Sequence, residues 1–146
     1  MSDSKLESVL KALLAVLQSG SPPGVKILRN EPLPQRIPKK GMLILRDGDP
    51  GQPDQEFSPP VYIYQHRAEI EVLAQNNNTG DRDAMFDTLR QAIALAINAD
   101  LTLGGECEYV EVEASQPQDV DVAGGDTIKG ATIPVILHFE TSNPLT

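Results

Sequence analysis

The 146-residue chain has the usual size of one domain and can bury a core without disulfides. Its single cysteine, Cys107, excludes a disulfide within the chain. Its formal net charge of −9 is divided unevenly: residues 1–67 hold nine Lys/Arg and seven Asp/Glu (+2), whereas residues 68–146 hold three and fourteen (−11). This acidic second half argues against a protein that grips nucleic acid through its phosphates, because such a protein needs a basic surface.

The first half of the chain predicts one helix, two short strands and two extended segments. Apolar residues at three- and four-residue spacing predict a helix over 3–18, which ends at the Gly/Pro-rich run after it. Residues 25–29 predict a first strand, and the three prolines of 30–40 allow only an extended arm before a second, buried strand at 41–47. Residues 47–59 are rich in turn formers, so we expect a mobile loop with no structure of its own.

The rest of the chain is organised around a long strand predicted at 60–74. At ~3.3 Å per residue it would reach roughly 45–50 Å, which is long for a domain of this size. One face of its period-two pattern is a core face, whereas the other is apolar at its two ends and charged across its middle. We expect the first face to be buried in the core and the second to be half covered.

The second half predicts one more helix and two strands. The helix covers roughly 81–99, a strand with an acidic side covers 106–113, and the last strand covers 128–141. Pro134 lacks a backbone donor, so we expect the last strand to lie at an edge or to be bulged at this point. Residues 142–146 are predicted to form a frayed tail.

The order of these elements, α-β-β-β-α-β-β, predicts a single α+β domain over residues 1–146. It would have one antiparallel or mixed sheet of about five strands, with both helices packed on it. No run approaches the ~18 apolar residues of a membrane span, and the start does not resemble a signal peptide. We therefore expect a protein that stays in the cytosol, or enters an assembly built there, without a membrane partner.

Residues with catalytic or metal-binding chemistry are few. His66, His138 and Cys107 could hold zinc only if three strands brought them together, and no close-spaced pair of ligands supports such a site. The acids that follow Asp47 miss the spacing of a calcium loop, because the twelfth position is Ser58. We predict no catalytic, cofactor-binding or metal-binding residues, and a structural or interaction protein in place of an enzyme.

Three segments of the chain resemble a known group of proteins. They are Asn-Glu-Pro-Leu-Pro-Gln-Arg-Ile-Pro at 30–38, Gly-Met-Leu-Ile-Leu-Arg-Asp-Gly-Asp-Pro-Gly at 41–51 and Tyr-Ile-Tyr-Gln-His-Arg-Ala-Glu-Ile-Glu-Val at 62–72. Short proteins encoded among phage and prophage tail genes are similar over about residues 28–73. Some of them are labelled acyl-CoA transferase, which nothing in this sequence supports.

The length and element order also resemble the tail terminator proteins of long-tailed phages. Those proteins close the growing tail tube as a sixfold ring and provide the surface to which the filled head is joined. The resemblance implies a ring of copies, the tail tube protein and head–tail connector proteins as partners, and DNA that passes through without specific binding. It also implies assembly in the host cytoplasm, followed by a place in the virion tail.

A ring needs head-to-tail contacts between unlike faces, for which complementary charges are suited. The candidates for a basic face are Arg29, Arg36, Lys39, Lys40 and Arg46, and those for an acidic face are Glu106, Glu108, Glu111 and Glu113. The lumen candidates are Glu69, Glu71, Asp119 and Asp121, and the candidates for a loop that docks on the tube are Asp47, Asp49, Asp54, Glu56 and Phe57.

Two other classes of function remain open. A different virion part, such as a head–tail connector or a tail-tube component, would differ in oligomer size and in the partner bound. A small enzyme, either a transferase or a metal-dependent hydrolase, would be favoured by a bound metal or by clustering of His66, His138 and Cys107.

Overall fold

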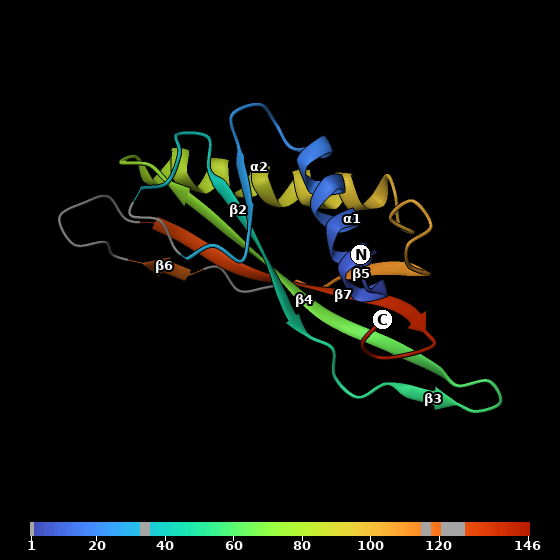
Figure 1. Ribbon diagram of the computed structural model, residues 1–146. Coiled ribbons are helices and arrows are strands. Elements are labelled where there is room, and N and C mark those ends of the chain that lie inside the picture. Colours follow the sequence, from blue (N-terminus) through green and yellow to red (C-terminus); the bar gives the residue numbers. More distant parts are fainter. Residues whose placement is uncertain (1, 33–35, 115–117, 121–127) are drawn as a thin grey trace.

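The computed structural model describes residues 2–32, 36–114, 118–120 and 128–146, and it shows two helices on one face of a mixed sheet (Figure 1). Within those residues the sheet has seven strands in the order β1-β2-β4-β7-β5, with β3 on β4 and β6 on β7. The α+β class is confirmed. The elements are α1 (Lys5–Gly20), β1 (Lys26–Arg29), β2 (Met42–Asp49), β3 (Asp54–Glu56), β4 (Val61–Gln75), α2 (Thr79–Asn98), β5 (Tyr109–Val112), β6 (Gln118–Val120) and β7 (Ile128–Thr141).

The centre of the sheet is the antiparallel pair of its two longest strands, β4 and β7. They stay in register from Tyr62 opposite Thr141 to Gln75 opposite Ile128. The prediction of a long strand is therefore confirmed, and this strand pairs with one of nearly equal length. Both sequences alternate apolar and other residues, and this period fixes which side chains face the helices.

The face toward the helices is the main core. From β4 and β7 it receives Ala68, Ile70, Val135 and Leu137, and α1 and α2 supply Leu13 and Leu89 among others. The two helices come very close where α1 ends, since a Cβ added to Gly20 would lie 2.5 Å from the Cβ of Ala96. The small residue at this crossing allows the helices to share one core.

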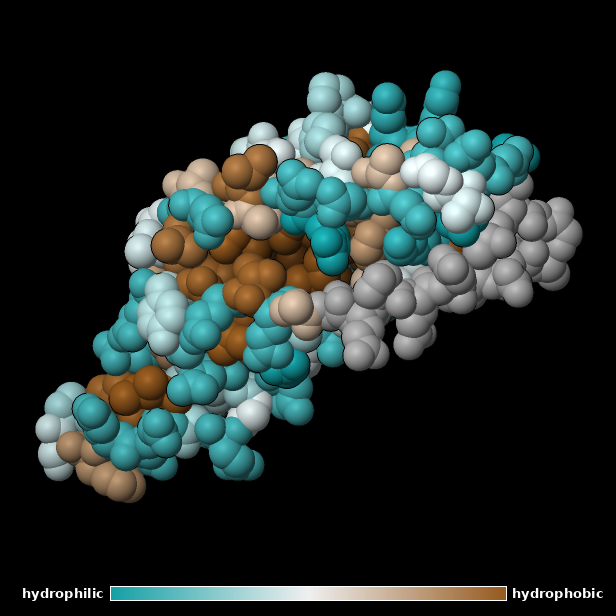
Figure 2. Space-filling model, turned by 180° about the vertical axis from the view of Figure 1, so that it is seen from behind, coloured by the Kyte–Doolittle hydropathy of each residue, from teal (hydrophilic) through white to brown (hydrophobic). Residues whose placement is uncertain are grey.

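The second face of the sheet carries apolar side chains at both ends of β4, Val61 and Ile63 at one and Leu73 at the other, and charges across its middle, as the alternation predicts. Met42, Ile44, Leu73 and Ile128 form a small buried cluster there, against which Ile37 of the proline-rich arm packs. Beyond this cluster lie the ion pairs described below. Seen from behind, hydrophobic side chains gather in the middle of the molecule, with a second group near the projecting hairpin end (Figure 2).

The structure differs from the sequence-based expectations in four strands. The strand predicted at 106–113 is shorter, since β5 covers only Tyr109–Val112. Residues 54–56 form β3, which pairs with Val61–Ile63 of β4, so residues 47–59 are partly a hairpin and not a structureless loop. Residues 118–120 form β6 on β7. β1 and β2 run parallel, because the arm between them carries the chain back along the sheet.

Pro134 lies inside β7, between the stretch that pairs with β5 and the stretch that pairs with β6. Its carbonyl accepts a hydrogen bond from the Glu113 amide (3.0 Å), on the side away from β4. The amide position and carbonyl of one strand residue point to the same side. The proline therefore interrupts only the outer row of hydrogen bonds, where β5 ends, and the β4–β7 pairing is continuous.

Candidate functional site

The groups with catalytic or metal-binding chemistry lie apart. His138 is opposite Gln65 in the β4–β7 register and His66 is opposite Leu137, so the two histidines occupy opposite faces of the sheet. Among the described residues no group of three or more His, Cys, Asp or Glu could hold a metal ion. The clustering that would favour an enzyme is therefore not found for His66, His138 and Cys107.

Cys107 is buried in the main core, with its Sγ 3.9 Å from the Leu101 carbonyl oxygen. Burial raises the pKa of this thiol to about 11, so little thiolate forms near neutral pH. We expect Cys107 in the folded protein to react with a disulfide reagent at pH 8 at least about 100-fold more slowly than in urea-unfolded protein. Stopped-flow reaction with Ellman's reagent measures both rates, and equal rates would contradict the buried, high-pKa thiol.

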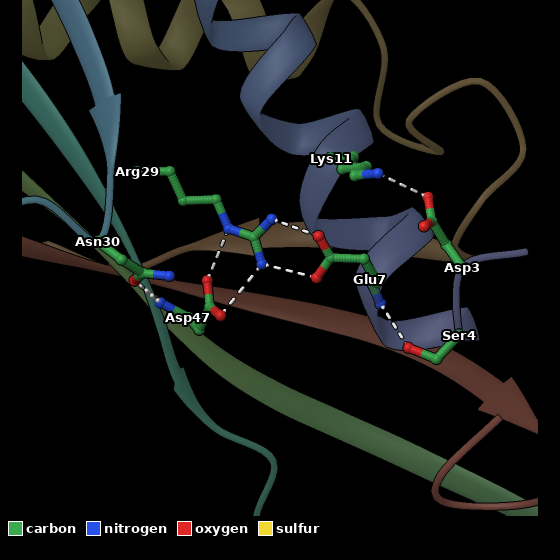
Figure 3. A network of polar contacts seen from close by, with 7 residues as sticks. All are labelled: Asp3, Ser4, Glu7, Lys11, Arg29, Asn30 and Asp47. Atoms are coloured by element: carbon green, nitrogen blue, oxygen red, sulfur yellow. Dashed lines mark hydrogen bonds and ion pairs between the residues drawn. The ribbon is translucent and has the colours of Figure 1, made fainter. Parts of the chain in front are cut away.

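Arg29 is the centre of a network of charges between α1, β1 and β2 (Figure 3). Its guanidinium donates two hydrogen bonds to Glu7 (2.7 and 2.9 Å) and two to Asp47 (2.8 and 3.1 Å). The Asp47 amide donates a hydrogen bond to Asn30 Oδ1, and the Asp47 carbonyl accepts one from His66 Nε2. Only 18% of the Arg29 side chain is exposed. Arg29 therefore ties the first helix to the sheet, which does not favour its predicted place on an interface.

The same contacts change the titration of the two carboxylates. Hydrogen bonds from Arg29 lower the pKa of both Glu7 and Asp47, and the same hydrogen bonds raise the pKa of Arg29. Because the folded-state pKa values are depressed, the stabilisation is present above the ordinary pKa values near 4 and is lost as the pH falls through the folded-state values.

Replacing Arg29 with methionine is expected to lower the free energy of unfolding by about 2 kcal/mol at pH 7, since two partly exposed carboxylates lose their cation. The difference from the wild type should shrink as the pH is lowered below about 4. Urea unfolding at pH 7, 5 and 3 measures it. The surface pair Arg90–Asp87 supplies the control: Arg90→Met should cost under about 0.5 kcal/mol. A cost for Arg29→Met that is equally small at pH 7 would contradict the network.

One basic candidate, Arg46, meets two lumen candidates, Glu69 and Glu71, on the second face of the sheet. Arg46 of β2 is paired with Glu71 of β4 (3.1 Å), and both side chains are about one-quarter exposed. Glu69 is next to them, opposite Arg46 in the register. Arg46 and Glu71 therefore belong to one surface and not to separate basic and lumen surfaces. Of the other lumen candidates, Asp119 is in β6, where only the backbone is described, and Asp121 lies outside the described residues.

The four candidate acidic residues are divided among several contacts. Glu113 is paired with Arg67 (2.8 Å), which raises the pKa of that arginine, and Glu111 contacts His138 Nε2 (2.6 Å). Glu106 Oε2 lies 3.6 Å from Lys5 Nζ, and the Glu108 side chain is exposed. A surface depression lined by Asp49, Arg67, Glu111 and Glu113 joins this group to the start of the predicted docking loop.

The remaining charged candidates separate to the two ends of the β4–β7 pair. At the end where β4 begins, the β3–β4 hairpin projects from the body of the molecule (Figure 1) and exposes Asp54, Glu56 and Phe57. At the other end, where β2 begins, exposed Arg36, Lys39 and Lys40 lie in the segment that leads to Met42. We call these the acidic end and the basic end. The sequence alone indicates that these residues lie on surfaces but does not place them at opposite ends of one strand pair.

No helix in the described part of the chain is long and apolar enough to cross a membrane.

No protein-family model matches the chain, and no curated protein sequence does. Among solved structures, a chain from the virion of a native gene transfer agent (GTA) particle is similar, with 15% identity and a TM-score of 0.42. The alignment covers 90% of this chain and 91% of that chain.

Proposed function

We propose that this chain is a structural protein of a phage or prophage tail, which caps the tail tube as a ring. The ring would end tube polymerisation and provide the surface to which the head is joined. The observation that carries the proposal is the placement of exposed Arg36, Lys39 and Lys40 at one end of the β4–β7 pair and of exposed Asp54 and Glu56 at the other. Unlike ends that attract each other lead to head-to-tail contacts between copies, and such contacts form a ring when the rotation closes.

The segments around residues 28–73 support the same assignment, because they resemble short proteins encoded among phage tail genes. On the terminator resemblance the ring would be a hexamer, assembled in the host cytoplasm, with the tube protein and connector proteins as its other partners. A net charge of −9 suits a lumen that DNA passes without specific binding, since phosphates are repelled.

Deletion of the gene that encodes this chain, followed by electron microscopy of the particles released, tests the proposed function. We expect tail tubes of variable and excessive length that carry no heads, and normal particles when the gene is supplied in trans. Tails of normal length without heads would point to a connector, and the absence of tubes to a tube component. Normal particles from the deletion strain would contradict any role in the virion.

A further inference from the structure

We propose that Phe57 at the tip of the β3–β4 hairpin of one copy docks beside Lys40 in a groove at the basic end of a second copy. This inference rests on the proposed assembly of copies through unlike ends, and it names the two surfaces that meet. The contact would be heterologous, because the hairpin and the groove are different parts of the chain.

The hairpin has the features of a docking element. β3 pairs with the first residues of β4, and Phe57 follows β3 directly in the turn between the strands. The Phe57 side chain is 76% exposed, and its neighbours Asp54 and Glu56 in β3 are exposed as well. An exposed aromatic ring on a projecting tip, flanked by charges of one sign, is suited to anchor a partner that offers an apolar site with the opposite charge.

A groove with these properties lies where the α1–β1 connection meets α2. It has a volume of about 440 Å³ and is lined by Pro22, Pro23, Val25, Lys40, Met85, Thr88 and Leu89. Most of these side chains are apolar, and Lys40 supplies a cation at the wall. Lys26 and Lys39, which are also exposed, lie next to Val25 and Lys40 in the chain. The groove can therefore accept an aromatic ring and attract the acids beside it.

The hairpin of the same copy cannot reach this groove. Ile63 of β4 pairs with the hairpin strand β3, whereas Leu73 pairs with Met42, two residues after Lys40. Ten residues of extended strand between them span roughly 33 Å. The ring of Phe57 and the groove are thus held apart at opposite ends of a rigid pair of strands, and only another copy can join them.

A second apolar groove, between α2 and β5, fits the hairpin less well. Ala94, Ile97, Val110 and Val112 line it, but Arg90 and Glu113 both stand at its wall. An acidic hairpin placed there would meet the Glu113 carboxylate as well as the arginine. The basic end has the charge that complements the hairpin, so the groove beside Lys40 is the partner we assign.

Cysteine cross-linking between two variants tests the contact. Ser58→Cys and Thr88→Cys place a thiol beside Phe57 on the hairpin tip and on the exposed groove wall, while the Phe57 ring is kept and the native Cys107 is buried. After mild oxidation we expect a covalent dimer when the two variants are mixed and a ladder of higher oligomers from the doubly substituted chain. Each single variant alone should remain mostly uncross-linked. Leu95→Cys, an exposed position about two turns further along α2, is the matched control and should give under one-tenth of the dimer.

Charge reversal gives an independent readout. Lys40→Glu is expected to lower the association constant of the chain, measured by light scattering, at least tenfold. Addition of Glu56→Lys in the same chain should restore most of the lost association. Both positions are exposed, so the variants should unfold at nearly wild-type urea concentrations.

The outcomes separate this contact from the proposed function. Oligomers that form normally, with no Ser58→Cys–Thr88→Cys cross-link and no effect of Lys40→Glu, would overturn the contact and leave the ring intact. A Ser58→Cys hairpin that cross-links to the tube protein in assembled tails, and not to Thr88→Cys, would overturn it too. Absence of both oligomers and cross-links at every concentration would remove the contact together with the assembly on which it rests.

Discussion

Replacing Gly48 with alanine is expected to lower the free energy of unfolding by about 3 kcal/mol. Gly48 has φ +76°, and an added Cβ would lie 1.9 Å from the Arg67 carbonyl oxygen and 2.9 Å from the Ala68 Cα. Positive φ alone costs an alanine roughly 1–2 kcal/mol, and relief of contacts this short requires a shift of the β4 backbone. Urea unfolding, with the m-value checked for two-state behaviour, measures the loss.

Gly51 is the matched control for this substitution. It also has a positive φ, +65°, but an added Cβ would meet no atom within 4 Å. Gly51→Ala should therefore cost only about 1 kcal/mol, the conformational part of the penalty. Equal losses for the two variants would contradict the close approach of Gly48 to β4.

The position of Gly48 makes this result informative about function. Between Arg46 and Asp49 the pairing with β4 shifts from Glu69 to Arg67, so β2 carries one extra residue there. Such a bulge bends the strand and redirects the chain. Gly48 is therefore the residue that lets β2 leave β4 and free the edge on which β3 forms the hairpin.

Truncation of Leu137 to alanine should cost about 3 kcal/mol. Leu137 is fully buried in the middle of β7, on the face that both helices cover. Loss of a leucine side chain at such a site removes its transfer free energy and leaves a cavity that the long β4–β7 pair cannot easily close. Thermal or urea unfolding measures the change.

Leu95 on α2 is the control, since 70% of its side chain is exposed. Leu95→Ala should change the free energy of unfolding by under about 0.5 kcal/mol. A loss for Leu137→Ala as small as that of Leu95→Ala would contradict the placement of the main core between the helices and the β4–β7 pair.

The regular part of the fold could be predicted because its periodicity is strong. Helix spacing in the segments of α1 and α2, and the alternation in β4 and β7, fix the elements and the buried faces. β3 escaped prediction because Asp54-Gln55-Glu56 has no apolar alternation, and it exists only because β4 offers an edge there. The parallel pairing of β1 with β2 depends on the course of the arm, which local sequence does not encode.

The functional surfaces could be predicted only in part. The charge imbalance between the two halves is visible in the sequence, but Arg29 finds Glu7 and Asp47 at separations of 22 and 18 residues. Those contacts follow from tertiary structure alone. The Arg46–Glu71 pair could be predicted from the alternation in the two strands. Arg46 lies on the same face of its strand as Met42 and Ile44, and Glu71 lies on the same face of its strand as Leu73. Side chains of both strands therefore had to meet on the second face.

Light scattering of the purified protein, over a range of protein and salt concentrations, tests most directly whether copies assemble through unlike charged ends. We predict a molar mass that rises from the 15.8 kDa of one chain toward about six times that value as the concentration increases. Added salt should reverse the rise, because it screens the exposed charges. A mass of 15.8 kDa at every concentration and salt, or an oligomer that salt leaves unchanged, would contradict this account.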